Sequence, residues 1–271
     1  MLSKNNRPAK ISNKKPKAGE QKKVELSVVI LTNRSDSRFI RSLKSAQLAD
    51  EILIIDNLSN NNWTELKKQF RFKVIKRVEK VGDFAYIRNW SLNQVSNNWV
   101  MFLDSDEVID SNSWVTINTL INQSIYRGAM VKRKDYFLGK KLNWGEVGSF
   151  NTLRLGQKNF LQFSRPIHET ASINGLVKKS SIVIKHYPHS SISSFIDKVT
   201  NYAKLESAFR KTQDQKFSLL ELLFFPLSKF IYNFIFKLGF LDGFRGLIYA
   251  TMMSIHSLGV RANQYEQSRN K

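Results

Sequence analysis

Three carboxylates stand directly after a short apolar run, in the stretch Trp99-Val-Met-Phe-Leu-Asp104-Ser-Asp106-Glu107. Four consecutive apolar residues before the first acid are typical of a strand covered on both faces in a parallel sheet. Burying carboxylates without partners is costly, so we expect these acids to emerge at a cleft on the carboxyl edge of that sheet. Carboxylates spaced Asp-x-Asp can share a hard divalent cation, which commonly bridges to substrate phosphates. The alternative is a solvated turn at a strand end.

A second acid, Asp56, ends another predicted strand at residues 51–55. A strand at 26–31 precedes it and runs into a polar corner at Thr32, and a weaker strand covers 72–75. Helix-like stretches separate these strands, which predicts a parallel sheet with right-handed crossovers. Since parallel strands end at one edge, Asp56 and the later acids are expected to face the same crevice.

The second half of the chain changes character. Short strands broken by glycines over 129–186 favour an irregular, partly antiparallel lid or acceptor region, and 191–211 reads as helix. Residues 217–240 are dense in Leu, Phe and Ile but interrupted by charged residues and a proline. This pattern favours an in-plane or shallowly inserted helix pair over a spanning helix. The alternative is a helical hairpin that covers the core.

Charge and composition narrow the class of partner. The net charge of +21 indicates an anionic partner such as a phosphate-bearing substrate, an acidic lipid surface or nucleic acid. Residues 1–23 carry eight Lys and Arg against Glu20 alone, which predicts a disordered basic tail. Without cysteine, neither a disulfide nor a thiolate metal site is possible. The N-terminal stretch lacks the apolar run of a secretory signal, so a cytoplasmic location is expected.

Several motifs, taken in order, carry a resemblance to a known family. They are Leu26–Thr32, Glu51-Ile-Leu-Ile-Ile-Asp56-Asn57-x-Ser59, Phe84-Ala85-x-x-Arg88-Asn89, Phe102-Leu-Asp-Ser-Asp-Glu107, Asp135-Tyr-Phe-x-Gly139, Leu153-Arg154-Leu155, His168-Glu169 and His186-Tyr187. Together they resemble family 2 glycosyltransferases of the GT-A fold. The bacterial branch that builds lipopolysaccharide core or related surface glycans, typified by core β-1,4-glucosyltransferases, is the most similar. The resemblance covers about residues 24–262.

The resemblance implies an α/β chain with a GT-A, Rossmann-like, mostly parallel sheet flanked by helices, followed by C-terminal amphipathic or hydrophobic helices. The implied domains are the tail at 1–23, a glycosyltransferase domain at 24–212, and a membrane-associating helical segment at 213–271. Within the middle domain, 24–110 would bind the nucleotide and 111–212 would meet the acceptor.

On the donor side, the resemblance implies that Asp56 hydrogen-bonds the nucleotide base, with Thr32 beside it. Arg88 would approach the base or the phosphates, and Asp104 would face the ribose. Asp106 would hold Mg²⁺ or Mn²⁺ against the diphosphate. One departure is visible, because Asn60-Asn61-Asn62 stands where the family often has a second acid. This leaves the preference for base and sugar open.

The remaining metal and acceptor residues follow from the same resemblance. Asp104 and His186 would complete the metal site. An inverting transfer needs a base to deprotonate the acceptor hydroxyl; Glu169 is the candidate and Glu107 its competitor, with Asp106 beside the reaction centre. His168 is expected nearby and Arg154 is expected to contact phosphate, although a lone histidine is often structural and an arginine in a surface strand is commonly a solvated charge.

The expected reaction is transfer of a sugar from a nucleotide-diphosphate sugar, a UDP-sugar in the first instance, to a lipid-linked or surface-glycan acceptor. A peripheral, monotopic position on the cytoplasmic face of an anionic membrane is expected, without a nucleic-acid partner. One alternative is a non-enzymatic basic protein that binds membranes or nucleic acid, but acids at strand ends would repel phosphate unless a metal intervenes. A nucleotidyltransferase is another, but residues 32–36 hold no glycine for a phosphate loop. A polymerising synthase would need several spanning helices.

Overall fold

The computed structural model describes residues 24–269 apart from 58, 60, 78–82, 124, 148 and 166–169. Its main sheet has nine strands in the order β3-β2-β1-β4-β8-β6-β11-β5, with β7 paired to β6, and a two-stranded ribbon is formed by β9 and β10. The strands are β1 (Val24–Thr32), β2 (Ala49–Asn57), β3 (Lys73–Arg77), β4 (Trp99–Asp104), β5 (Glu107–Ile109), β6 (Gly128–Phe137), β7 (Lys140–Lys141), β8 (Ser149–Gln157), β9 (Leu161–Ser164), β10 (Thr170–Ile173) and β11 (Val177–His186). The helices are α1 (Ser37–Ser45), α2 (Thr64–Gln69), α3 (Phe84–Leu92), α4 (Ser113–Ile121), α5 (Ile192–Thr212), α6 (Leu219–Ile231) and α7 (Phe244–Arg269).

The first half of the sheet is parallel, as predicted. β1 pairs with β2 on one side and with β4 on the other, and β3 continues the sheet beyond β2. In this register Thr32 lies opposite Asp56, and Leu31 lies opposite Asp104. The two acidic strand ends therefore meet at one edge of the sheet, as predicted, and a crevice at that edge stays a prediction.

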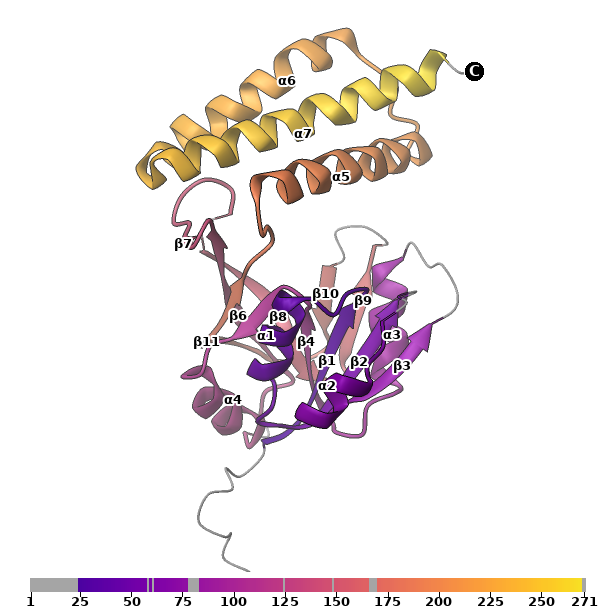
Figure 1. The fold of residues 1–271 in the computed structure, drawn as a ribbon, viewed down its shortest axis with the longest axis vertical. Helices are drawn as coiled ribbons and strands as arrows, with labels where there is room; N and C mark the ends of the chain where they lie inside the picture. Colours follow the sequence, from indigo (N-terminus) through magenta and orange to yellow (C-terminus); the bar gives the residue numbers. More distant parts are fainter. Residues whose placement is uncertain are drawn as a thin grey trace, which may run out of the picture.

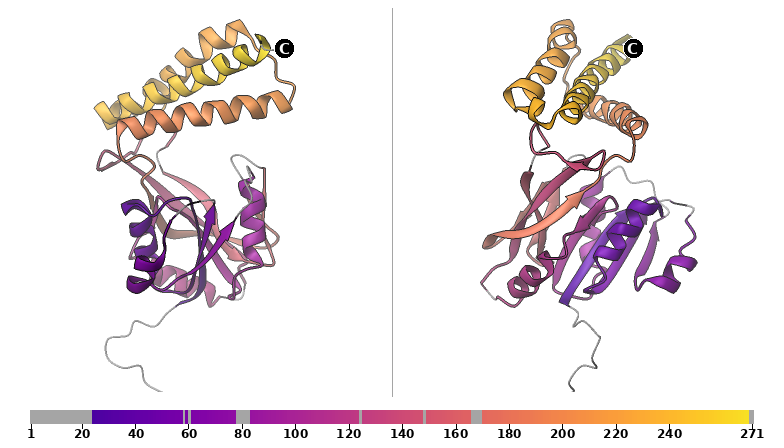
Figure 2. Two further views of the ribbon diagram at one scale, coloured as in Figure 1. Left: turned by 45° about the vertical axis from the view of Figure 1, so that its right-hand side comes forward. Right: turned by 60° about the vertical axis from the view of Figure 1, so that its left-hand side comes forward.

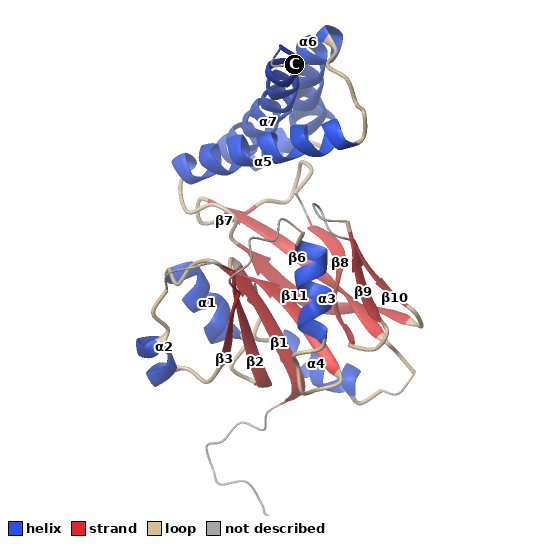
Figure 3. Cartoon of the chain, turned by 90° about the vertical axis from the view of Figure 1, so that its right-hand side faces the viewer, coloured by secondary structure: helices blue, strands red, loops and turns tan. Residues whose placement is uncertain are grey.

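Helices cover both faces of this sheet (Figure 3). α1 and α4 pack on one face, where Phe39, Leu43 and Trp114 join the buried β1, β2 and β4 residues. α3 and the β9–β10 ribbon pack on the other face, where Phe102 and Phe163 meet edge to face at 4.9 Å. Because both faces are covered, the strands read as continuous apolar runs in the sequence.

The region 129–186 is partly antiparallel, as predicted, but its strands do not form an irregular lid, and its role toward the acceptor stays a prediction. β8 runs antiparallel to both β4 and β6, and β11 runs parallel to β6, so this region extends the main sheet. The alternating residues Ala129 and Val131 are fully buried and join the same core as the first half. Gly128 and Gly156 leave room for the Ile173 side chain, since a Cβ on either glycine would lie within 3 Å of it. These two glycines thus let the β9–β10 ribbon approach the sheet.

Helices α5, α6 and α7 form a separate layer at the end of the sheet where the acidic strand ends lie (Figures 1 and 2). α5, predicted at 191–211, is the helix nearest the sheet, and α6 is the farthest from it (Figure 1). A small core ties the layer to the β6–β7 hairpin; its members are Phe137, Leu142, Phe195, Val199 and Met252. The domain boundary at 212 stays a prediction, and in the structure α5 packs along α7.

Candidate active site

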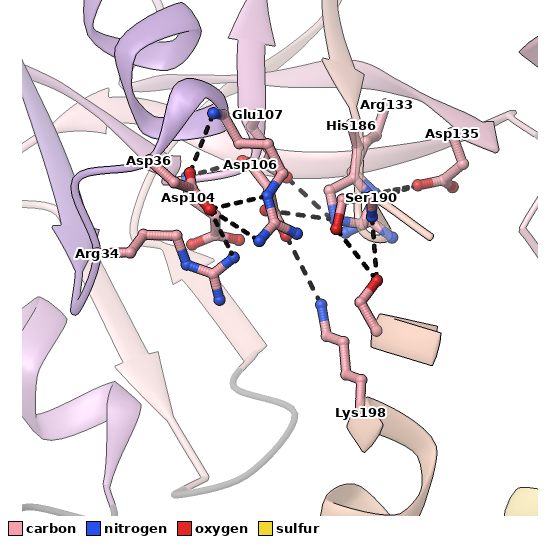
Figure 4. Close-up of polar contacts among 12 residues, drawn as sticks. Arg34, Asp36, Asp104, Asp106, Glu107, Arg133, Asp135, His186, Ser190 and Lys198 are labelled. Carbon is pink, nitrogen blue, oxygen red and sulfur yellow. Dashed lines mark hydrogen bonds and ion pairs between the residues drawn. The ribbon is translucent and has the colours of Figure 1, made fainter. Parts of the chain in front are cut away.

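Four chain segments bring their charged residues together at the carboxyl edge of the sheet (Figure 4). Asp104 ends β4, Asp106 lies in the following turn, and Glu107 begins β5. His186 ends β11, where the register places it beside Glu107 of β5 on one side and Asp135 of β6 on the other. The turn is fixed to β11 because the backbone N–H of Tyr187 donates to the Asp106 carbonyl at 2.8 Å.

Two buried arginines hold the first and third of these acids. Arg88 Nη2 lies 2.7 Å from Asp104 Oδ1, and Arg154 Nη2 lies 2.8 Å from Asp104 Oδ2 and 3.3 Å from Glu107 Oε1. Glu107 is fully buried and also accepts the backbone N–H of Asp104 at 3.0 Å. Burial alone would raise the pKa of Asp104, but Arg154 and Arg88 outweigh it and hold this pKa well below its usual range. Asp104 is therefore a carboxylate at neutral pH.

These positions differ from what the resemblance implied for the arginines. Arg88 is 2% exposed and its guanidinium lies 5.4 Å from the Phe102 ring centroid, beneath the acids and away from solvent. Arg154 is likewise buried between Asp104 and Glu107. Both arginines are placed to position carboxylates, not to meet donor phosphates. Burial and two arginine neighbours also argue against Glu107 as a base that reaches an acceptor.

His186 and Asp106 have the arrangement of two ligands of one cation. His186 Nδ1 contacts Asp135 Oδ1, while Nε2 lies 3.5 Å from Asp106 Oδ1. A carboxylate that accepts from one ring nitrogen leaves the lone pair of the other facing outward, and this is the usual support of a metal-ligating histidine. Ligands bound at about 2.0–2.2 Å from one ion are roughly 3 Å or more apart, so the residues fit a cation.

The other predicted metal ligand, Asp104, does not join this pair, because each of its oxygens is paired with an arginine. Within the described part of the chain, no group of three or more His, Cys, Asp or Glu side chains is arranged to hold a metal. Asp106 and His186 would therefore supply two ligands, and substrate phosphate and water would supply the others, as is usual for Mg²⁺.

Asp56 and Thr32 form the corner on the other side of the edge. Asp56 is buried; its Oδ2 accepts the indole N–H of Trp63 at 2.8 Å, and its Oδ1 accepts the backbone N–H of Ser59 at 3.2 Å. Thr32 Oγ1 donates to the Arg34 carbonyl at 2.8 Å and accepts the Arg34 N–H at 3.0 Å. Both residues thus shape the loops that follow β1 and β2. A carboxylate oxygen has a second lone pair, so a contact from Asp56 to a base stays a prediction.

Sequence reasoning missed three charged residues of the site. Asp135 orients His186, and Arg133 lies between Asp135 (3.5 Å) and Glu107 (3.8 Å). Lys198, from α5, reaches within 3.6 Å of Asp106 Oδ2. The parallel register of β6 with β11 would have revealed Asp135, but no local pattern marks Lys198.

The predicted residues His168 and Glu169 lie outside the described residues. The assignment of Glu169 as the base that accepts the acceptor proton stays a prediction, as does the role of His168.

Known proteins share this chain's sequence and fold to different degrees. An uncharacterized glycosyltransferase of Rickettsia typhi is 22% identical over 238 residues, which cover 83% of this chain and 81% of the relative. Among solved structures, S. aureus TarS 1-349 is similar over 91% of this chain and 92% of that one, with 14% identity and a TM-score of 0.44. The same protein in complex with UDP-GlcNAc gives 13% identity and a TM-score of 0.45 over the same shares.

The sequence model of glycosyl transferase family 2 matches residues 27–182, more than half of the chain. The matched range contains the first β-α-β units and the acids Asp56, Asp104 and Asp106 at the carboxyl edge. With its mostly parallel, helix-flanked GT-A-like sheet, the chain belongs to glycosyl transferase family 2 and is a glycosyltransferase.

Proposed function

We propose that the enzyme is an inverting, metal-dependent glycosyltransferase that moves a sugar from a nucleotide-diphosphate sugar, a UDP-sugar in the first instance. The proposed acceptor is a lipid-linked or surface glycan of the lipopolysaccharide-core type. The observation that supports the metal-dependent donor site is the Asp135–His186–Asp106 arrangement, which suits Mg²⁺ or Mn²⁺.

Each residue has a separate task in this proposal. Bound between Asp106 and His186, the cation would neutralise the negative charge of the leaving diphosphate. Asp104, whose side chain is 32% exposed, stays ionised and directs a free face to the ribose hydroxyls. Asp56 contacts the base at the other side of the edge. Glu169 takes the proton of the acceptor hydroxyl as that oxygen attacks the sugar.

The test screens the purified protein against a panel of nucleotide sugars with Mn²⁺, measuring hydrolysis and Mn²⁺ binding. Asp106→Asn is expected to abolish metal-dependent turnover and to weaken Mn²⁺ binding by at least about 10-fold. Asp110→Asn is the matched control, because Asp110 pairs with Lys185 at 2.7 Å and that ion pair includes neither Asp106 nor His186. If Asp106→Asn keeps full activity in EDTA-treated buffer, the metal site is wrong.

We also propose that the enzyme lies on the cytoplasmic face of a membrane as a monotopic protein. Leu219–Phe236 is long and apolar enough to cross a membrane, yet only 6% of it is buried in the protein. Eight of its exposed side chains form what we call the outer apolar face: Leu219, Leu220, Leu223, Phe224, Leu227, Ile231, Ile235 and Phe236. Soluble monomers rarely expose so large a continuous apolar patch, which marks a protein or membrane contact.

The contacts of α6 favour a position in the plane of the membrane over a spanning one. Ser254 of α7 donates to the Pro226 carbonyl at 2.7 Å, and Arg261 lies 3.6 Å from Glu221, so α6 lies along α7 over its length. Figure 2 shows the same side-by-side path in both views. A helix bound in this way along a polar neighbour suits shallow burial of one face at the headgroup boundary.

The basic residues Lys229, Lys237 and Arg245 accompany the apolar helices and would suit lipid headgroups, but two of them face the protein. Lys229 pairs with Glu146 at 2.5 Å, and Arg245 donates to the Leu138 carbonyl at 3.3 Å, so both bind the connection between β6 and β8. Lys237 is exposed at the end of the patch. We therefore expect apolar burial to dominate lipid binding and anionic lipid to add to it.

Vesicle flotation with phosphatidylcholine, with and without phosphatidylglycerol, tests this position. Leu223→Ser and Phe224→Ser each remove a side chain that is 61% exposed. Full burial of such a side chain is worth about 1.5–3 kcal/mol, and burial of the 61% still exposed is worth about 1–2 kcal/mol, so each change is expected to weaken binding about 5- to 30-fold. Val115→Ser is the control, because it changes an apolar side chain that is 75% exposed on α4, at the opposite end of the molecule (Figure 1). Equal flotation of all variants, or dimers that form without lipid binding, would contradict the membrane proposal.

A further inference from the structure

One cation enters the candidate active site from the helical layer. Lys198 lies in the first half of α5, and its Nζ is 3.6 Å from Asp106 Oδ2. Figure 4 shows the side chain extending from the helix toward Asp106. The distance is longer than a direct hydrogen bond, and 36% of the side chain is exposed. Lys198 is therefore near the proposed metal ligand without being locked onto it.

The backbone of Lys198 is held firmly although its side chain is open. Phe195 and Val199 flank it and are buried in the small core with Phe137 and Met252. Phe195 also stacks on His189 at 3.6 Å, directly after the β11 strand that supplies the metal-ligand candidate. The site edge and the start of α5 thus form one packed unit, which fixes where the ammonium group can reach.

The three arginines near these acids already interact with carboxylates. Arg88 and Arg154 pair with Asp104, Arg154 also pairs with Glu107, and Arg133 lies beside Glu107 and Asp135. All three lie among the carboxylates behind the metal-ligand pair. Lys198 approaches Asp106 from α5, in the helical layer. A phosphate bound to a metal ion at Asp106 would therefore bring its negative charge close to the Lys198 ammonium group.

We propose that Lys198 binds the β-phosphate of the departing nucleoside diphosphate, a role that rests on the donor class of the proposed function. In the transfer, the acceptor oxygen bonds to the anomeric carbon while the bond from that carbon to the β-phosphate oxygen breaks. The electron pair goes to the phosphate oxygen, and the acceptor proton goes to the base. The Lys198 ammonium stays protonated and donates a charge-assisted hydrogen bond to the oxygen that gains the charge.

The test compares two ligands that differ by this phosphate. Binding of UDP and of UMP is measured by calorimetry with Mn²⁺ for the full chain and for Lys198→Met, Lys198→Arg and Lys204→Met. If a panel of nucleoside diphosphates shows another base to be preferred, that diphosphate and its monophosphate are used. Lys204 is the matched control, because it is exposed on the same helix.

Lys198→Met is expected to weaken diphosphate binding about 10-fold, to leave monophosphate binding within about twofold, and to lower kcat. Lys198→Arg should recover part of both losses, and Lys204→Met should change neither. Equal changes for the two ligands would overturn the proposal. So would tighter Mn²⁺ binding with unchanged diphosphate preference, which would make Lys198 a mere counter-charge of Asp106. A wild-type chain that binds no nucleoside diphosphate at all would instead refute the donor class, and this proposal with it.

Discussion

Replacing Arg154 with methionine removes the cation shared by two site carboxylates while keeping most of the side-chain volume. Arg154 Nη2 lies 2.8 Å from Asp104 and 3.3 Å from Glu107, which is fully buried. Breaking a buried pair by removing one partner costs about 3–5 kcal/mol, because the remaining charge is uncompensated. In the variant, Asp104 still pairs with Arg88, and Glu107 still accepts the backbone N–H of Asp104. We therefore expect a loss at the lower end of that range, about 3 kcal/mol in the free energy of unfolding at pH 7.

This loss is expected to shrink in acid. Burial raises the pKa of Asp104, but Arg154 and Arg88 hold it well below its usual range in the folded chain, whereas the unfolded value is about 3.9. A depressed carboxyl pKa stabilises the fold fully above the unfolded pKa, and this contribution is lost as pH falls toward the folded pKa. In the Arg154→Met variant the pKa of Asp104 is lowered less, so acidification removes less of the variant's free energy of unfolding. Because the unfolded pKa is common to both proteins, their stability difference narrows as pH falls through the folded pKa of Asp104 in the variant, which still pairs with Arg88 and so lies below the usual range.

Urea unfolding followed by tryptophan fluorescence at pH 7 and at about pH 2.5, where the variant's Asp104 begins to take up a proton, measures both differences. Arg127→Met is the control, because Arg127 donates to the Gln157 amide oxygen at 2.9 Å and covers the Phe160 ring at 4.7 Å. The Arg127→Met variant loses a side chain of the same kind that interacts with an amide and an aromatic ring, so the pKa of a carboxylate is not involved. An Arg154→Met difference that is the same at both pH values, or an Arg127→Met difference that narrows equally, would refute the reasoning.

Three further outcomes are expected. Asp135→Asn should weaken Mn²⁺ binding about 10- to 100-fold in a titration without donor, because the carboxylate orients His186; unchanged binding would remove the support for that ligand. Glu169→Gln should lower the transfer rate by at least about 100-fold with donor binding retained, and near-normal transfer would assign the base elsewhere. Asp56→Ala should weaken nucleotide binding in equilibrium titration and lower the free energy of unfolding by about 1–3 kcal/mol, since Trp63 loses its acceptor; a stability loss alone would make Asp56 structural.

The strand ends could be predicted from sequence because their signal is local. A buried run followed by an acid marks the carboxyl edge of a parallel strand, and this placed Asp56 and Asp104 at one edge correctly. The partners of those acids could not be predicted in the same way. Arg88 and Arg154 stand in motifs that suggest phosphate contact, yet packing by several distant strands buries them beneath Asp104. Burial of a charged side chain depends on long-range packing, which short patterns do not encode.

The arrangement of the later strands, over 129–186, could not be predicted for a related reason. Gly139, Gly145 and Gly175 suggested breaks and do lie in turns or bends with positive φ, but the strands β6, β8 and β11 beside them join one continuous sheet. The alternation of apolar residues in 129–131 was the better guide, because it reports burial on one face.

The helical layer has two proposed roles, membrane binding through its outer helix and phosphate binding through its inner helix. Its outer helix carries the outer apolar face, while its inner helix carries Lys198 to the site edge and shares a core with the β6–β7 hairpin. Met252 of α7 belongs to that core, so deleting 217–271 would expose Phe137 and Phe195 and disturb the start of α5. Truncation would then confuse loss of membrane binding with damage to the site. Point changes on the outer face separate the two, because those side chains contact neither the core nor the charged cluster in the described part of the chain.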